Sequence, residues 1–372
     1  MVDVFQMGLA AYGLMFVGRS RMAGKVALVW LAILLSSLAL LQIYGYSFDI
    51  LAKQGIPAAC VYVGYCCLLE RTTPISLLKA YKKVCFYAAL FGLVQYALSM
   101  VGIPILMGTP GRLDSLAYEP SHYAIAVAPA AYLCVRGLIR SGKKMNYTTL
   151  VIIGSLLLTV SLTAFIIMLV CSIIFVFQKQ GAIIAISAMT LAFYFYTHRE
   201  YLPETVRDRI EATEQSMEKE NTIDSTSNLT ILSPLTNWKV AMDTMEKGRI
   251  LGNGLGGHRD AYLNYYKGSA FSMRDRFETN SIGGHCLFIR SVSEFGLLGM
   301  VVYVWWLFKG LASAAKGSQI WWTLSAVYMV GRSIKLAGFF ELGLPIFILA
   351  PLIFYRKYPV PVRKRRLGRV AA

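Results

Sequence analysis

The sequence predicts an all-α polytopic membrane protein with about eleven transmembrane helices and one large, partly helical loop. Of its 372 residues, 56% are hydrophobic and only 15% are charged, whereas about a quarter of the residues in a soluble domain are charged. The mean hydropathy is +0.54. The apolar residues also gather in blocks of about 17 to 25, the length at which a helix crosses the hydrocarbon core of a bilayer. These features exclude a soluble globular fold.

The apolar blocks follow one another with short connections between most of them. We place the predicted spans at about residues 4–18, 26–46, 54–70, 84–107, 122–139, 147–161, 162–178, 181–197, 285–308, 318–333 and 338–355. The apolar run 147–178 is divided near Ser161, because a single helix of that length would overshoot the membrane. We expect no cleavable signal peptide, since no basic segment precedes the first block and no small-residue cleavage site follows it.

Basic residues predict the orientation of the spans, because Lys and Arg concentrate in short cytoplasmic loops. An eleven-span topology places the following basic segments on one side: 19–25, 71–83, 140–144, 179–180, 309–316 and 356–369. The N-terminus then lies outside. This concentration accounts for the net charge of +17, and we prefer a topogenic role for RKRR (363–366) to a nucleic-acid patch. The seven cysteines show no spacing typical of a metal site or a disulfide framework.

The chain therefore divides into four parts. Residues 1–197 hold transmembrane helices 1–8, with a short outer loop at 108–121, and residues 285–355 hold helices 9–11. Residues 198–284 form a large outer loop that contains 13 of the 20 acidic residues, and 356–372 form a basic cytoplasmic tail.

The large outer loop carries two predicted amphipathic helices, which would lie as a lid over a cavity between the spans. One covers 203–221. The other covers 233–248, with Ser233 as N-cap, Pro234 at the first helical position and Gly248 at its end. The apolar stripe of this second helix consists of Leu235, Trp238, Ala241, Met242 and Met245.

A glycine-rich segment, LGNGLGG (251–257), follows the second helix. Gly252, Gly254 and Gly257 match GxGxxG, but no strand or βαβ unit surrounds them, so we reject a dinucleotide site. Two interpretations remain open. The glycines make a tight turn that brings backbone N–H groups and His258 or Arg259 close to an anion, or they form only a connector.

Ionisable residues gather in the outer loop GTPGRLDSLAYEPSHYA (108–124), where we expect Arg112, Glu119 and His122 to lie close together at the membrane edge. An ordinary helix start at an interface would also explain this segment.

A second ionisable group lies in GGHCLFIRSVSEFGLLG (283–299), where His285, Arg290 and Glu294 enter an apolar run. Such groups are costly at membrane depth and usually functional. Arg290 and Glu294 are four residues apart, so they share one helical face and can pair. We favour this pairing over a catalytic role for Glu294.

These segments resemble the O-antigen polymerase and O-antigen ligase superfamily, bacterial inner-membrane glycosyltransferases that use polyprenyl-diphosphate-linked sugars. The resemblance rests on EPSHYA (119–124), the late outer loop, LGNGLGG and the segment 283–299. The family pattern starts a span with His-Asn-x-x-Leu and continues with Glu-x-Gly-Leu-x-Gly; here Cys286 replaces the Asn. The form EPS-x-x-A points to the polymerase branch. The resemblance implies a C-type glycosyltransferase-like fold whose outer loops and active site face the periplasm.

The implied reaction transfers a growing glycan from its lipid diphosphate to a sugar hydroxyl of a new repeat unit. Imidazole suits the base and guanidinium suits the diphosphate. The resemblance therefore assigns the catalytic group to His285, Arg112 and Glu119. It assigns substrate binding to Arg290, His122, Lys239, Arg249, His258 and Arg259. The family usually has an Arg near the helix that contains Trp238, where this chain has Lys239.

We expect neither a metal nor a cofactor, because the donor is already activated and no paired carboxylates are evident. The implied partners are the lipid-linked donor and acceptor, membrane lipids, a chain-length regulator and a flippase, and no nucleic acid. Two alternatives stay open: a ligase that transfers glycan to lipid A-core, and a transporter of the lipid-linked glycan. The absence of an evident internal repeat argues against the transporter.

Overall fold

The computed structural model describes residues 2–103, 105, 107–108, 112–117, 119–141, 146–177, 207, 211, 229–269, 278, 280–315 and 319–357. Every regular element in these ranges is helical. Four helices are long and apolar enough to cross a membrane: α2 (Arg21–Tyr44), α4 (Pro74–Met100), α5 (Pro120–Ser141) and α12 (Leu287–Ala315). The described part of the chain is therefore consistent with a helical membrane protein.

The remaining elements are shorter. The other α-helices are α1 (Val2–Leu14), α3 (Ile56–Arg71), α6 (Tyr147–Leu158), α7 (Leu162–Phe177), α10 (Leu229–Glu246), α11 (His258–Tyr266), α13 (Ile320–Ile334) and α14 (Leu344–Lys357). Single turns of 3₁₀ or π-helix complete the set: η1 (Val17–Arg19), η2 (Leu51–Gly55), η3 (Ser115–Ala117) and η6 (Glu341–Gly343).

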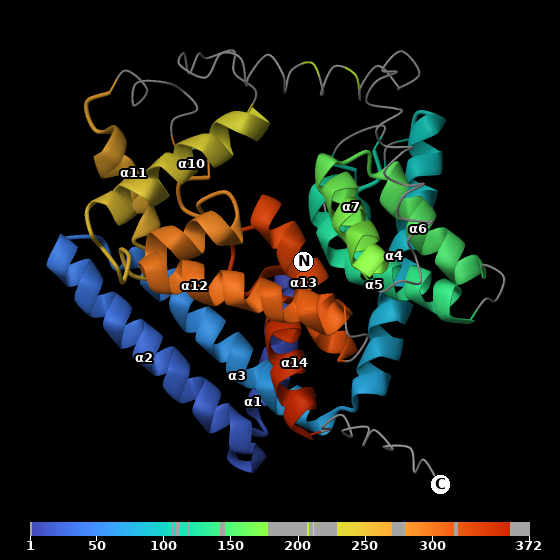
Figure 1. Ribbon diagram of the computed structural model, residues 1–372, viewed down its shortest axis with the longest axis horizontal. Coiled ribbons are helices and arrows are strands. Elements are labelled where there is room, and N and C mark those ends of the chain that lie inside the picture. The colour runs from blue at the N-terminus through green and yellow to red at the C-terminus, as the bar shows by residue number, and fades with distance from the viewer. Residues whose placement is uncertain are drawn as a thin grey trace, which may run out of the picture.

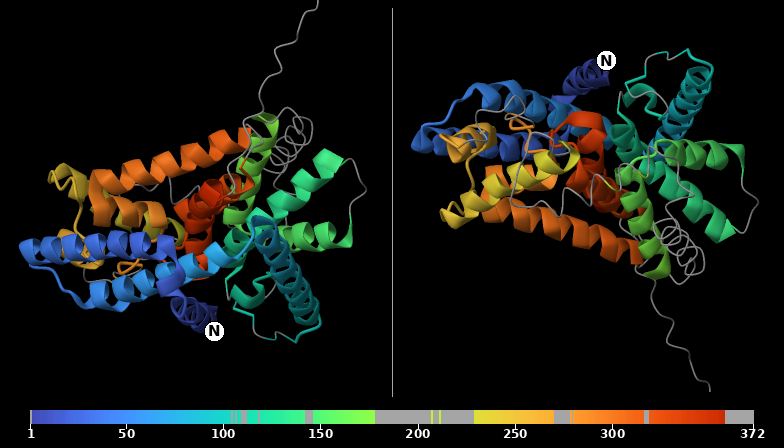
Figure 2. Two further views of the ribbon diagram at one scale, coloured as in Figure 1. Left: turned by 90° about the horizontal axis from the view of Figure 1, so that it is seen from below. Right: turned by 90° about the horizontal axis from the view of Figure 1, so that it is seen from above.

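Helix α13 lies at the centre of the molecule. It packs against α5, α7, α12 and α14, while α3 packs against α1, α2 and α14. Figures 1 and 2 show α4 to α7 gathered at one end of the molecule and α2, α10 and α11 at the other. Segments far apart in sequence therefore meet around α13.

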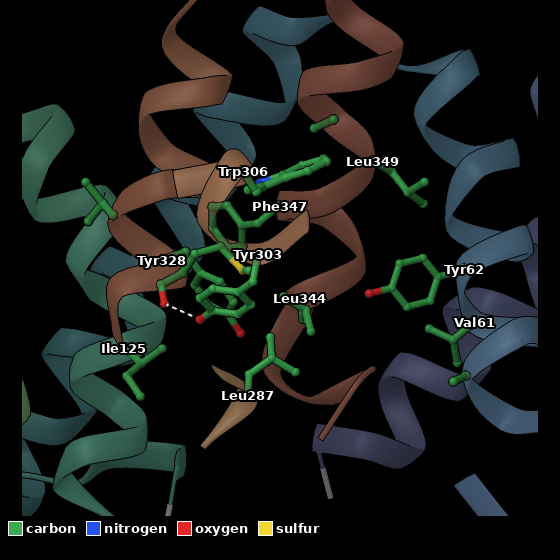
Figure 3. Close-up of a cluster of buried hydrophobic side chains, with 14 of the residues drawn as sticks. Val61, Tyr62, Ile125, Leu287, Tyr303, Trp306, Tyr328, Leu344, Phe347 and Leu349 are labelled. Carbon is green, nitrogen blue, oxygen red and sulfur yellow. Dashed lines mark hydrogen bonds between the residues drawn. The ribbon is translucent and has the colours of Figure 1, made fainter. Parts of the chain in front are cut away.

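The main core is built from aromatic side chains on α12, α13 and α14 (Figure 3). Tyr328 stacks on Phe347 with ring centroids 4.2 Å apart. Tyr303 donates its hydroxyl proton to the carbonyl of Met329 at 2.9 Å, and the indole of Trp306 donates to Ser325 at 2.8 Å. Large rings contribute most of the buried area in such a core. Tyr303 and Trp306 keep partners for their polar atoms, whereas the indole nitrogens of Trp321 and Trp322 have none within the described residues.

Helices occur at most of the predicted spans, and the predicted division of 147–178 is confirmed. Helix α6 ends at Leu158 and α7 begins at Leu162. Thr159 and Val160 lie in the break, and Val160 has a positive φ of 44°. The predicted span 181–197 lies outside the described residues. So does the helix predicted at 203–221, except for Arg207 and Glu211, which are both helical.

Several boundaries differ from the expected ones. Helix α4 begins at Pro74, ten residues before the predicted 84, because Thr73 caps it and Pro74 occupies the first turn. The apolar pattern locates the membrane-facing part of a helix and misses such polar first turns.

The second loop helix also starts earlier than expected. Helix α10 begins at Leu229, so Ser233 is not its N-cap and Pro234 lies inside it. Gly248 does end it, with a φ of 67°. Ala241 is buried, and Trp238, Met242 and Met245 pack around it against α12. The helix therefore lies directly on α12.

Candidate active site

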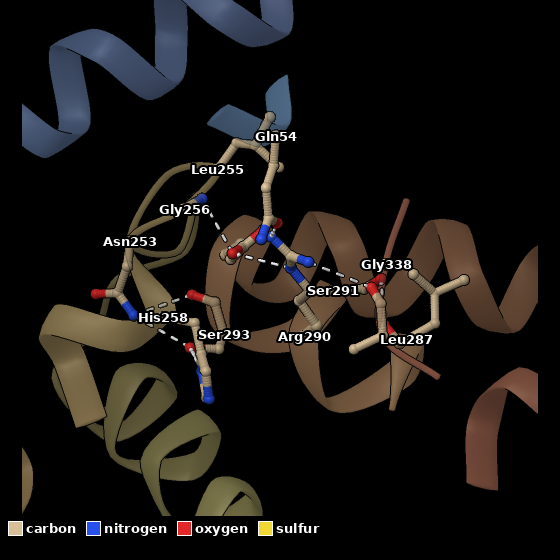
Figure 4. A network of polar contacts seen from close by, with 12 residues as sticks. Gln54, Asn253, Leu255, Gly256, His258, Leu287, Arg290, Ser291, Ser293 and Gly338 are labelled. Carbon is tan, nitrogen blue, oxygen red and sulfur yellow. Dashed lines mark hydrogen bonds and ion pairs between the residues drawn. The ribbon is translucent and has the colours of Figure 1, made fainter. Parts of the chain in front are cut away.

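The glycine-rich turn 251–257 packs against a kink in α12 (Figure 4). The kink lies at Gly296, where φ is 60° and ψ is −142°. Gly254 donates its N–H to the carbonyl of Glu294 at 2.9 Å, and Gly256 donates to the Glu294 carboxylate at 3.0 Å. A Cβ on Gly252 would lie 2.5 Å from the carbonyl oxygen of Glu294. The glycines therefore bring backbone N–H groups to an anion, and that anion is a carboxylate of the chain itself.

The expected pairing of Arg290 with Glu294 is confirmed. The Nε of Arg290 donates to Glu294 at 3.0 Å, and both side chains are almost completely buried. The guanidinium group also donates to the amide oxygen of Gln54 at 2.6 Å and lies over the ring of Phe339, 4.6 Å from its centroid. In this arrangement the protein itself compensates the charge of Arg290.

His258 is also enclosed by the protein. Its exposure is 0%, its Nδ1 lies 2.7 Å from the Ser293 hydroxyl and its Nε2 lies 2.8 Å from the amide oxygen of Asn237. Burial lowers the pKa of His258 to about 3, and the nearby charge of Arg290 acts in the same direction. Both ring nitrogens have protein partners. In this geometry a neutral imidazole joins α10, α11 and α12, and the expected substrate-binding role of His258 stays a prediction.

A second polar cluster lies where α5 begins and α13 ends. The carboxylate of Glu119 accepts a hydrogen bond from the ammonium of Lys335 and another from Ser121 at 2.6 Å. Its other oxygen lies 3.1 Å from Nε2 of His122. Burial would raise the pKa of Glu119, but these hydrogen bonds outweigh it and the pKa lies below its ordinary value. We call Glu119, His122, Lys335 and His285 the junction cluster.

His285 joins this cluster from the segment before α12. Its Nδ1 lies 3.0 Å from the hydroxyl of Ser233, which also accepts from the amide of Asn280 at 2.8 Å. Burial, and then the charge of Lys335, lower the pKa of His285 to about 4, and the carboxylate of Glu119 opposes this shift. The ring is therefore neutral near pH 7.

The backbone around His285 is unusual. His285 and Leu336 both have positive φ angles, 66° and 70°. Cys286 and Leu336 form an isolated parallel bridge that ties the start of α12 to the segment after α13. Non-glycine residues rarely adopt such angles, and strained positions of this kind gather at functional sites.

Arg332 lies fully buried in α13 and was not predicted as a site residue. One of its terminal nitrogens donates to the carbonyl of Gly338. Its Nε and other terminal nitrogen have no hydrogen-bond partner within the described ranges. Arginine remains protonated in proteins, and a buried charge without a counterion is costly. An anion would relieve this cost.

The other expected site residues lie elsewhere. Arg112 donates to the carbonyls of Thr159 and Val160, at 3.1 and 2.9 Å, in the break between α6 and α7. The guanidinium of Arg112 thus meets backbone carbonyls, while Glu119 and His122 pair with each other.

Three weaker candidates are also separated from the junction cluster in their contacts. Arg249 donates to the hydroxyl of Tyr46 at 2.8 Å and lies over the ring of Tyr44. Arg259 pairs with Glu278 at 3.2 Å. Lys239 is half-buried on α10.

The expected cavity beneath a lid stays a prediction, because much of the large loop lies outside the described residues. The two clearest hollows on the described surface measure about 790 and 650 Å³, and no predicted site residue lines either of them. Within the described residues, no three His, Cys, Asp or Glu side chains gather as metal ligands.

Sequence reasoning missed Lys335 and Arg332. Lys335 follows the predicted span 318–333, and Arg332 is an ionisable residue inside it. The rule that identified Arg290, that charge within an apolar run is usually functional, would have identified Arg332 as well.

Comparison with known proteins does not assign the chain to a family. No family model matches the chain, and no curated protein matches it. What the geometry defines is a helical protein of membrane character, in which imidazole and cationic groups meet where α5, α12 and α13 come together.

Proposed function

We propose that this chain polymerises polyprenyl-diphosphate-linked oligosaccharide repeat units at the periplasmic face of the bacterial inner membrane. The growing glycan passes from its lipid diphosphate to a sugar hydroxyl of a new unit, yielding O-antigen or a related surface polysaccharide.

The observation that carries the proposal is the junction cluster. It joins EPSHYA (119–124) to the start of GGHCLFIRSVSEFGLLG (283–299), because Glu119 pairs with Lys335 and the next residue, Leu336, bridges to Cys286. Two of the motifs behind the family resemblance thus meet in space although the chain separates them widely. The third, LGNGLGG, packs against the other end of the same segment.

The cluster has the groups that the transfer requires. In the reaction, the acceptor oxygen bonds to the anomeric carbon, the bond from that carbon to the diphosphate oxygen breaks, and the hydroxyl proton leaves. A neutral imidazole at His285 orients the hydroxyl and accepts its proton.

Cations near His285 suit the diphosphate that departs. Lys335 belongs to the junction cluster. Arg332 is buried, and two of its guanidinium nitrogens have no hydrogen-bond partner within the described residues. We assign the departing diphosphate to these two residues in place of Arg112 and Arg290, whose guanidinium groups already bind carbonyls and a carboxylate.

The test uses purified protein with a synthetic polyprenyl-diphosphate-linked repeat unit and no added nucleotide. We expect a ladder of elongated glycans. Transfer only to a lipid A-core acceptor would instead identify a ligase, and movement across a vesicle membrane without a new glycosidic bond would identify a transporter. Failure in all three assays would overturn the proposal.

The decisive variant is His285→Asn, because asparagine accepts the positive φ of 66° more readily than alanine does. We expect the protein to insert normally while elongation falls by about 10²- to 10⁴-fold, the usual contribution of a general base. Gln319→Asn is the matched control, since Gln319 also has a positive φ but lies at the far end of α13. If the His285→Asn variant makes normal glycan ladders, His285 is not the general base.

A further inference from the structure

A basic hollow of about 650 Å³ lies where the start of α2 and the ends of α3 and α14 meet. Six basic residues line it: Arg19, Arg21, Lys25, Arg71, Arg356 and Lys357. Glu70 is the single acidic residue in its wall. Arg290 contacts the opposite ends of these helices, because its partner Gln54 precedes α3 and its partner Ala337 precedes α14.

Four of these six cations have no salt bridge to a carboxylate within the described residues. The carboxylate of Glu70 accepts the backbone N–H of Met22 at 3.2 Å. Arg71 lies over the ring of Phe16, and Arg356 meets the sulfur of Met22 at 3.1 Å. Across the described ranges, no salt bridge joins Arg19, Arg21, Arg71 or Arg356 to a carboxylate.

Helix dipoles explain the positions of only some of the six basic residues that line the hollow. Arg71, Arg356 and Lys357 lie in the last turns of α3 and α14, where cations offset the negative end of the dipole. Arg19, Arg21 and Lys25 surround the start of α2, the positive end, where further cations are unfavourable. An anion placed between these three residues would offset their charges.

An apolar groove of about 790 Å³ adjoins the hollow and shares Arg21 and Lys25 with it. From these two residues it continues between α1, α2 and α3, lined by Leu14, Ala27, Trp30, Leu31 and Val63. A cationic mouth that opens into an apolar groove matches a phosphate group with a hydrocarbon chain attached.

We propose that the hollow and groove together bind one anionic phospholipid of the adjacent leaflet. Its headgroup phosphate lies among Arg19, Arg21 and Arg356, and one acyl chain follows the groove along α2. Basic pockets between membrane helices recognise anionic headgroups in this way. This site is independent of the proposed glycan transfer.

Native mass spectrometry of the purified protein tests the proposal, with phosphatidylglycerol and phosphatidylcholine of the same acyl chains as probes. We expect selective binding of one phosphatidylglycerol. The double variant Arg21→Gln with Arg356→Gln should weaken it about thirtyfold, from about a factor of five for each cation removed. Inorganic phosphate alone should bind far more weakly, because the groove contributes to the affinity.

Two further variants separate the site from general surface charge. Lys79→Gln with Lys83→Gln removes two exposed lysines of α4 from the same predicted side and should leave binding unchanged. Ala27→Trp fills the groove and should reduce lipid binding while leaving the basic residues intact. Three outcomes would each overturn the proposal. They are equal binding of the two lipids, an equal loss of lipid binding in the two double variants, and phosphate binding as tight as lipid binding.

Discussion

Arginine side chains in this protein divide by what their guanidinium groups meet. Arg290 pairs with Glu294, Arg112 binds two carbonyls, and Arg249 lies on aromatic rings. Arg332 donates to a single carbonyl, and two of its nitrogens have no partner within the described ranges. Of these four side chains, Arg332 is therefore the best placed to bind a ligand.

Replacing Arg112 by lysine separates a structural role from a catalytic one. An ammonium group cannot reproduce the planar fork that serves the carbonyls of Thr159 and Val160. We expect Arg112→Lys to lower stability by about 1–2 kcal/mol, the value of one or two hydrogen bonds, with activity retained in the folded fraction. Thermal unfolding in detergent and glycan elongation measure the two effects. If stability is unchanged but elongation is lost, Arg112 would instead be assigned to binding the departing diphosphate.

Buried imidazoles predict how stability depends on pH. Because the pKa of His258 is lowered to about 3 and that of His285 to about 4, the unfolded chain binds protons below about pH 6.5 while the folded chain does not. Stability should therefore fall from pH 6.5 to pH 5, by up to about 1.4 kcal/mol per unit for each histidine. In this window Glu119 stays ionised in both states. Unfolding midpoints at several pH values check this, and His258→Gln should flatten the profile; parallel profiles would contradict it.

Single elements show how far the sequence could be interpreted alone. The run 251–257 left open a tight turn near an anion or a mere connector, and the helical spacing of Arg290 and Glu294 indicated a pair. That Glu294 is the anion of the turn was inaccessible, because it depends on a contact between segments about 40 residues apart.

Helix starts were the least predictable feature. Hydropathy placed α4 too late, because its first turns carry Ser and Lys residues and are held by the cap at Thr73. The start of α10 was placed too late because Ser233 and Pro234 resemble a helix start, although the helix already begins at Leu229. The shift in α10 turned Ser233 from an expected cap into the partner of His285.

The contact between the glycine turn and α12 can be tested with two glycines. We expect Gly252→Ala to cost about 3 kcal/mol or more, since it combines a φ of 74° with a collision against the Glu294 backbone. Gly248→Ala is the control, because its φ of 67° is similar and no atom lies within 4 Å of the added Cβ. It should cost about 1 kcal/mol. Equal unfolding midpoints for the two variants would show that the turn does not press on α12.

At the scale of the whole molecule, several distant segments meet in ways that hydropathy cannot reveal. Three predicted cytoplasmic segments lie together at the basic hollow, in keeping with the expected topology. The grouping of EPSHYA with Lys335 depends on α13 lying beside both α5 and α12, which no local pattern encodes.

The orientation in the membrane has a direct test. Lys247→Cys and Lys25→Cys place thiols at exposed positions near opposite ends of α2, in a chain whose native cysteines have been replaced. A membrane-impermeant maleimide applied to intact spheroplasts should label the first nearly completely and the second only after lysis. Labelling in the reverse order would place the junction cluster on the cytoplasmic side.

The close contact at the kink in α12 also limits the substitutions that related sequences can tolerate. Gly252 and Gly296 each occupy the space that a side chain on the other would need. A substitution at one of the two glycines alone would force the loop away from the helix. Related sequences should therefore keep both glycines or lose both together, and this linkage offers a way to recognise distant members of the lineage where overall similarity has disappeared.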